Sequence, residues 1–186
     1  MKRSALYHHH QHARAQFADY HGWQLPATFS SADAEASQAA QSAGLADLSY
    51  RAKFQTCSQP ANNWWRLTDT RYLVTGEPGI EVPPDAIDLT SVYTNLLLAG
   101  PRSRDVLGKL TSLNTSPERL PNHSCVEANV GHVHTIVLRE DLPRIPAYHL
   151  LVTRDYAESF WEAVMHAGHE FELEPLGLEA LERMRA

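Results

Sequence analysis

Tyr93-Thr-Asn-Leu-Leu-Leu-Ala-Gly-Pro-Arg-Ser-Arg-Asp-Val-Leu107 is the stretch that decides the fold. Its first part, from Tyr93 to Ala99, is a nearly continuous apolar run, which is typical of a buried strand. Gly100 and Pro101 then stop the strand, and proline suits the first turn of a helix because its φ is already helical. A buried helical stripe is predicted to follow, made by Val106, Leu107, Leu110 and Leu113.

The residues after this stretch alternate between strand and helix patterns. A hairpin is predicted from Cys125–Asn129 and His132–Leu138 around Val130-Gly131, and a further strand from Ala147–Thr153. The segment from Asp155 to Ala167 is predicted to be a helix that ends at Gly168, with a buried stripe made by Tyr156, Phe160 and Val164. The order β-α-β-β-β-α indicates an α+β fold with largely antiparallel sheets and packed helices.

The residues before the stretch are less regular. Ser30 and Ser31 can cap a helix over Ala32–Ala43, with Gly44 at its end. Residues 56–64 are rich in turn formers and indicate a loop, and residues 76–85 indicate another. Between them, Arg71–Thr75 is predicted to be a short strand.

Length and charge limit the function. The chain has 186 residues, which predicts a single domain over residues 1–186. Its formal net charge of −6 argues against a nucleic-acid partner, which requires a basic face. No apolar run approaches the roughly 20 residues of a membrane span, and the start does not resemble a secretory signal. We therefore expect a cytoplasmic protein with no membrane contact, in which Cys57 and Cys125 are reduced structural thiols.

Several clusters could carry chemistry, and each also has a simpler structural interpretation. The histidines from His8 to His12 could bind a metal, but no acidic or thiol ligand is close in sequence. His132 and His134 would share one face of a strand, without an identifiable third ligand. We therefore expect no metal site.

Two further pairs have the same ambiguity. Trp64-Trp65 could form a stacking wall or simply pack, and Glu140-Asp141 could act in acid–base chemistry or form a turn. Neither cysteine is paired in sequence with a histidine that could activate it, so structural thiols are the simpler interpretation. From the residues alone, no catalytic residue is identified.

Three stretches resemble the folate-binding domain of the glycine-cleavage T-protein (aminomethyltransferase) family. Ser4 to Phe29 looks like the family's opening, with Gly22-Trp-Gln-Leu-Pro26 in place of "GWEMP". Gly44-Leu-Ala-Asp-Leu-Ser-Tyr-Arg-Ala-Lys-Phe54 is similar to "GLFDVSHMGRF", and Leu96 to Leu107 is similar to "LALQGPKAREVL". A weaker match covers Pro175–Leu181. The resemblance implies the T-protein type of α+β fold, without the C-terminal β-barrel, and a histidine cluster that is native sequence.

Departures from the family pattern bear on its activity. The "DDL" aspartates, which position the aminomethyl group and the folate, have no counterpart between Cys57 and Asp88. Arg51 replaces a methionine, and His149 stands where the family has its second folate-side glutamate. The resemblance therefore implies no aminomethyl transfer by the isolated chain and weak or absent binding of tetrahydrofolate. The remaining folate contacts that it implies are Tyr72, Arg139 and Tyr148.

The shortened middle of the chain is similar to the gamma subunit of heterotetrameric sarcosine oxidase. The matching stretches are Trp65–Val74, Ala86–Thr90 and Leu98–Leu107. This resemblance implies an accessory protein of folate-linked one-carbon or N-methyl-amine metabolism. Such a protein would work with a sarcosine-oxidase-like subunit as its partner, or it would form a homo-oligomer. The alternative is a minimal tetrahydrofolate-dependent aminomethyltransferase or methyltransferase. The family's iron–sulfur-assembly branch ranks last, because its "KGCYxGQE" motif is not found.

Overall fold

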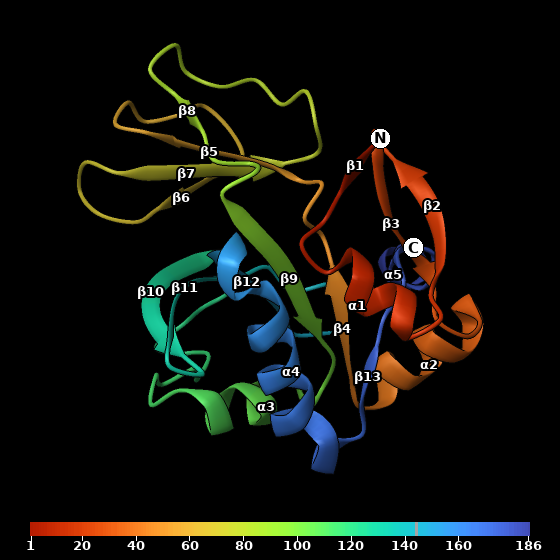
Figure 1. Cartoon of the computed structure of the whole chain (residues 1–186). Helices are drawn as coiled ribbons and strands as arrows, with labels where there is room; N and C mark the ends of the chain where they lie inside the picture. The colour runs from red at the N-terminus through yellow and green to blue at the C-terminus, as the bar shows by residue number, and fades with distance from the viewer. Residues whose placement is uncertain (144) are drawn as a thin grey trace.

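The fold is built around a six-stranded sheet that places the apolar run of the sequence near its centre (Figure 1). The computed structural model describes residues 1–143 and 145–186. The strand order is β10 (Ser124–Val130), β11 (Val133–Arg139), β12 (Ala147–Thr153), β9 (Tyr93–Ala99), β4 (Ala43–Asp47) and β13 (Leu173–Pro175). All neighbours are antiparallel except β4 and β13, which are parallel.

One face of this sheet is covered by two helices, α3 (Ser103–Leu110) and α4 (Ala157–Gly168). Alternate side chains of β9 and β12 point toward these helices, because successive residues of a strand face opposite sides. The core on this face includes Leu96, Leu98, Tyr148, Leu150, Val106, Phe160 and Trp161. Short 3₁₀ turns flank α4 at Arg154–Tyr156 and His169–Phe171.

The opposite face is covered by two different structures. Near β4, residues such as Leu97 and Ala99 pack against α2 (Ala32–Gln41) and α5 (Leu178–Arg185). Toward β11, Ile136, Leu138 and Leu151 pack against Trp65 and Leu73 from a separate small sheet. The small sheet thus closes the part of the face that the helices leave open.

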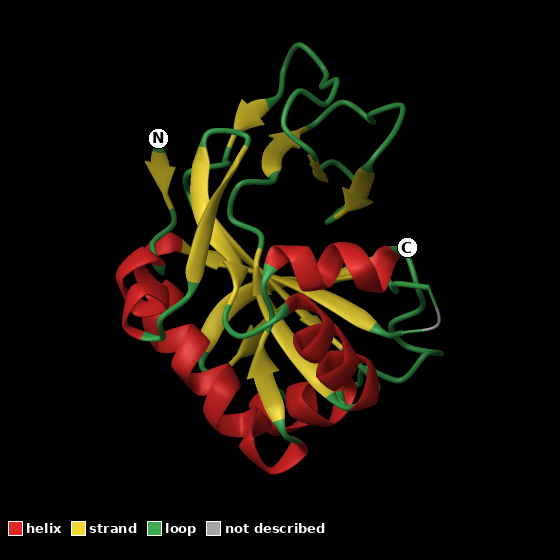
Figure 2. Cartoon of the chain, turned by 90° about the vertical axis from the view of Figure 1, so that its right-hand side faces the viewer, coloured by secondary structure: helices red, strands yellow, loops and turns green. Residues whose placement is uncertain are grey.

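The small sheet has four short antiparallel strands in the order β6 (Trp64–Arg66), β7 (Tyr72–Gly76), β5 (Ala52–Thr56) and β8 (Ile87–Asp88). Figure 2 shows helices around the lower part of the molecule, while this upper part consists of strands and long loops. The chain enters it directly from β4, through the short linker from Leu48 to Arg51.

A third sheet lies at the N-terminus, in the order β1 (Lys2–Arg3), β3 (Trp23–Thr28) and β2 (Gln16–Tyr20). The short helix α1 (Tyr7–His12) connects β1 to β2. Within the described residues, no sheet closes into a barrel, and no helix combines the length and apolarity of a membrane span.

The structure confirms the α+β fold with largely antiparallel sheets, and β9 and β12 have the predicted bounds. Two boundaries were wrong. Helix α2 ends at Gln41, and Gly44 lies inside β4 rather than at the helix end; glycine fits there because a Cβ would come within 2.8 Å of the Cβ of Ala39 in α2. Helix α3 ends at Leu110, so Leu113 is not part of its stripe.

Two side-chain placements were also wrong. Tyr156 is 53% exposed in the turn before α4, instead of contributing to a buried stripe. His132 lies in the hairpin turn with a φ of 67°, so it does not share a strand face with His134. The strands of residues 1–56 and the short β6, β8 and β13 have no counterpart in the sequence-based prediction.

Candidate functional site

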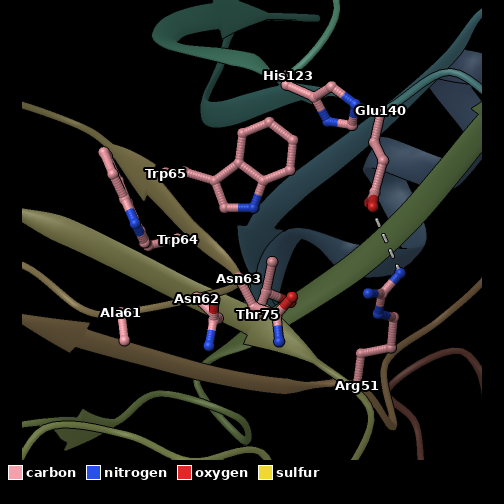
Figure 3. Close-up of a pocket in the computed structure, with 9 residues that line it drawn as sticks. All are labelled: Arg51, Ala61, Asn62, Asn63, Trp64, Trp65, Thr75, His123 and Glu140. Carbon is pink, nitrogen blue, oxygen red and sulfur yellow. Dashed lines mark ion pairs between the residues drawn. The ribbon is translucent and has the colours of Figure 1, made fainter.

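A cavity of about 390 Å³ lies where the small sheet meets the end of β11 (Figure 3). Each side chain comes from the end of an element or from a loop: the β4–β5 linker, the loop before β6, β6, β7, the start of β10 and the end of β11. The lining residues are Arg51, Ala61, Asn62, Asn63, Trp64, Trp65, Thr75, His123 and Glu140. A volume of this size is ordinary for a small-molecule site.

A chain of polar contacts runs from the interior of the large sheet to this cavity. Asn95 Oδ1 lies 3.1 Å from His149 Nδ1, and His149 Nε2 lies 3.1 Å from Glu140 Oε2. Glu140 Oε2 also faces Arg51 Nη1 at 3.9 Å, as Figure 3 shows. The first two residues are fully buried and the last two line the cavity, so the sheet interior fixes the position of the Glu140 carboxylate.

Burial and pairing determine which of these contacting side chains are charged. The hydrogen bond from His149, together with the charge of Arg51, lowers the pKa of Glu140 to about 2. Burial lowers the pKa of His149, so its neutral form is favoured. His149 donates from Nε2 to the Glu140 carboxylate, and its Nδ1 faces Oδ1 of Asn95. At neutral pH the cavity therefore contains the Glu140 carboxylate and the Arg51 guanidinium, beside the imidazole of His123.

Two buried donors at the cavity have no hydrogen-bond partner among the described residues. They are Nε of Arg51, whose side chain is 11% exposed, and Oγ1 of Thr75, a residue that is 5% exposed. Buried polar groups in proteins are almost always hydrogen-bonded, and an unpaired one costs about 1–3 kcal/mol. Their location at one cavity indicates a site that a bound molecule would complete.

The two neighbouring tryptophans have different roles. Trp65 is 8% exposed and packs on Leu73 and the large sheet, while part of its indole lines the cavity. Trp64 is half-buried and packs edge-on against Tyr72, with ring centroids 5.5 Å apart. The pair is therefore mainly a packing element, and Trp65 alone is well placed to form an apolar wall.

The three predicted folate contacts do not lie together. Arg139 and Tyr148 are paired across β11 and β12, with the guanidinium 5.9 Å from the tyrosine ring. Tyr148 faces α3 and α4, on the opposite side of the sheet from His149 and Glu140. Tyr72 is buried in the small sheet, and none of the three lines the cavity. Their contact with a folate stays a prediction.

Arg139 has partners within the protein. It forms two hydrogen bonds with Asp141, at 3.0 and 2.9 Å, and donates to the carbonyl of Leu120 at 2.8 Å. Asp141 is thus a structural partner of Arg139, while its neighbour Glu140 belongs to the cavity. Both acids follow the end of β11, and their side chains have different partners although they are adjacent in the sequence.

The histidine cluster contains a buried contact that the sequence did not indicate. His10 is fully buried, and its Nε2 lies 3.3 Å from Oδ2 of Asp47 in β4, an acidic residue that is distant from the cluster in sequence. Burial alone would raise the pKa of Asp47, but hydrogen bonds from His10 and Ser49 hold it below its ordinary value. The pair ties α1 to the large sheet.

Two further features concern possible metal ligands and the Cys125 thiol. No group of three or more potential metal ligands occurs in the described part of the chain. Burial raises the pKa of the Cys125 thiol to about 11, and its Sγ contacts the carbonyl of Arg66. A thiol with so high a pKa is a poor nucleophile at neutral pH.

Comparison with known proteins identifies a matching family model and related aminomethyltransferases. Residues 65–186 match the family model described as the GCVT N-terminal domain. An aminomethyltransferase from Desulforamulus reducens is 22% identical over 236 residues; the match covers all of this chain and 63% of the relative. The chain thus spans less than two thirds of that relative.

Two solved structures share the fold. The glycine cleavage system aminomethyltransferase T from Bartonella henselae superposes with a TM-score of 0.79 at 17% identity, over 99% of this chain and 62% of that one. A chain of the heterotetrameric sarcosine oxidase from Corynebacterium sp. U-96 superposes with a TM-score of 0.61 at 15% identity, over 76% of this chain and 92% of that one.

Proposed function

The chain belongs to the GCVT N-terminal domain family, and from that premise we propose that it is an accessory, non-catalytic aminomethyltransferase-like protein. It acts in folate-linked one-carbon or N-methyl-amine metabolism, beside a sarcosine-oxidase-like subunit or as a homo-oligomer. The single observation that carries the proposal is the state of the Glu140 carboxylate in the cavity.

Glu140 is the one acidic residue among those that the structure places at the cavity, and it is already engaged by His149 and Arg51. Transfer of an aminomethyl group requires a group that holds the amine and moves a proton near neutral pH. A carboxylate with a pKa of about 2 does not move protons at pH 7. Glu140 is therefore unsuited to proton transfer, which supports the non-catalytic role.

A multi-subunit partner is supported by the likeness to a chain of a heterotetrameric enzyme, which the match covers almost completely. On this ground we propose that the chain works beside a partner subunit.

The test compares the purified chain with the Desulforamulus reducens aminomethyltransferase in the transfer of an aminomethyl group to tetrahydrofolate. We expect activity at the level of the blank from the chain, unchanged in Glu140→Gln. Turnover above the blank, lost in Glu140→Gln, would refute the non-catalytic role. Light scattering on the purified chain, and again after co-expression with sarcosine-oxidase-like subunits, tests whether the chain forms a complex. A stable monomer that captures none of these subunits would contradict the proposed partner.

A minimal tetrahydrofolate-dependent aminomethyltransferase or methyltransferase is the second candidate. The observation in its favour is that the fold of an aminomethyltransferase extends over 99% of the chain. Calorimetry with a reduced folate separates the two candidates. We expect weak or absent binding, because the one carboxylate at the cavity is already paired and cannot receive a pterin's donors freely. Sub-micromolar affinity would favour the second candidate.

A further inference from the structure

We infer that the cavity at Arg51 and Thr75 is a binding site for a small monocarboxylate with a flat apolar body. This inference names a ligand class for the cavity of the proposed function, and it rests on that proposal only because both concern the same cavity. Binding requires no catalysis and no partner, so it is tested on the isolated chain. Two buried donors at this cavity have no partner within residues 1–143 and 145–186.

Arg51 has unused hydrogen-bonding capacity directed at the cavity. Its Nη1 lies 3.9 Å from Glu140 Oε2, which is too far for a good hydrogen bond, and its Nε has no partner among the described residues. In Figure 3 the guanidinium reaches the cavity from the β4–β5 linker, opposite Glu140. A planar guanidinium matches the two oxygens of a carboxylate better than it matches a neutral acceptor.

The linker that carries Arg51 is held firmly. The backbone carbonyls of Ser49 and Arg51 both accept hydrogen bonds from the Nζ atom of Lys53, at 3.0 and 2.7 Å. Lys53 is itself fully buried in β5. Because the backbone on both sides of the side chain is fixed, the guanidinium is presented to a ligand at little entropic cost.

Thr75 supplies a second donor to the same cavity. It is opposite Lys53 in the register of β5 and β7, so it lies two residues along the ladder from Arg51. Its hydroxyl is buried and unpartnered. A carboxylate oxygen placed between the guanidinium and this hydroxyl would satisfy both donors.

The rest of the lining limits the charge and the shape of the ligand. Glu140 stays ionised beside Arg51, so a dianion such as phosphate would be repelled more strongly than a monocarboxylate. The indole of Trp65 provides a flat apolar wall, and Asn62 and Asn63 close the rim. Aromatic surfaces favour flat partners, which indicates an aromatic or unsaturated body behind the carboxylate.

The experiment measures binding of sodium benzoate to the full chain by calorimetry, with benzamide as the uncharged ligand of the same shape. We expect saturable benzoate binding at millimolar concentration or below, and affinity for benzamide lower by about tenfold or more, because a charge-assisted hydrogen bond is lost. Equal affinity for the two ligands, or no benzoate binding at millimolar concentration, would overturn the inference.

Two variants locate the site. Arg51→Gln is expected to weaken benzoate binding by about tenfold or more, while the matched control Arg66→Gln leaves it unchanged. Arg66 lies beside Trp65 on β6 but is 58% exposed and pairs with Asp69 outside the cavity. Unchanged affinity in Arg51→Gln would refute the site.

Thr75→Val keeps the shape of the side chain and provides a second test if Arg51→Gln does not fold. It is expected to weaken benzoate binding about threefold to tenfold, since one donor is lost. Unchanged affinity in this variant would likewise refute the site. Aminomethyl transfer measured in the assay above would refute the non-catalytic role and leave this inference standing, so the two failures are distinguishable.

Discussion

The six-stranded sheet and the four-stranded sheet are both largely antiparallel, yet an inner strand of the first and an edge strand of the second differ sharply in burial. In β12 every residue from Ala147 to Val152 is buried, whereas both residues of β8 are exposed. The large sheet is covered on both faces, and the small sheet mainly carries loops. The large sheet thus maintains the shape of the molecule, while the small sheet and its loops supply most of the cavity lining.

The largest expected effect is that of Gly100→Ala, at the end of β9. Gly100 has a φ of +133°, and a Cβ would come within 2.3 Å of the Ser42 carbonyl oxygen and 2.6 Å of that of Ala39. We expect a loss of more than about 4 kcal/mol in the free energy of unfolding, or no folding at all. Urea unfolding measures it.

The matched control is Gly79→Ala in a loop of the small-sheet region. Gly79 also has a positive φ, of +92°, but a Cβ there would meet nothing within 4 Å. Only the backbone strain remains, which costs about 1–2 kcal/mol. If the two alanine variants were equally stable, the contrast between the tightly packed sheet and the open one would fail.

The next effect compares two aliphatic side chains. Leu98 of β9 is fully buried, so Leu98→Ala is expected to cost about 3 kcal/mol through lost burial and a new cavity. Ile87 of β8 is 62% exposed, and Ile87→Ala is expected to change stability by less than about 0.5 kcal/mol. Chemical denaturation of both variants checks the difference. A large loss at Ile87 would indicate that a partner or a second copy covers β8.

The third effect concerns the junction between the sheets, where burial lowers the pKa of Lys53 from 10.5 to about 7. Between these values the unfolded chain binds more protons than the folded one, so the free energy of unfolding rises with pH. Through Lys53 alone, the free energy of unfolding is expected to rise by about 2 kcal/mol from pH 7 to pH 9. In Lys53→Met this part of the rise should be absent, and an identical pH profile in the variant would contradict the assignment.

The smallest effect compares two buried threonines. Thr75→Val in β7 removes an unpartnered hydroxyl and is expected to raise the free energy of unfolding of the unliganded protein by about 1 kcal/mol. Thr135→Val in β11 removes a hydroxyl that donates to the carbonyl of Val133 at 3.0 Å, and is expected to lower it by about 1 kcal/mol. Thermal unfolding should show shifts of opposite sign; two losses would mean that the Thr75 hydroxyl already has a partner.

The difference in burial between inner and edge strands also explains which strands could be predicted from the sequence. The strands β9 and β12 are buried on both faces, so they are continuous apolar runs with clear ends. The strand β5, Ala52-Lys-Phe-Gln-Thr56, buries a lysine and mixes polar with apolar residues, so its pattern indicates no strand. The pairing that stabilises β5 comes from β7 and β8, which lie 16 or more residues later.

The candidate site was predicted less well than the fold, because its residues meet only through strand register. Glu140 and His149 were both singled out, but as separate features, and their contact depends on the pairing of β11 with β12. Thr75 and Asn95 carry no signal in a single sequence. Arg51 was noticed only as a departure from a family pattern, and that departure places a cation in the cavity.

The parallel pairing of β13 with β4 also has a kinetic consequence. Leu173 of β13 pairs with Ala43 of β4, so about 130 residues of chain separate the two partners. Contacts so distant in sequence slow folding, because the intervening loop must close before they form. During synthesis, one edge of β4 stays without its neighbour until β13 has left the ribosome. Until then this edge presents unpaired backbone groups, and an exposed strand edge of this kind favours aggregation.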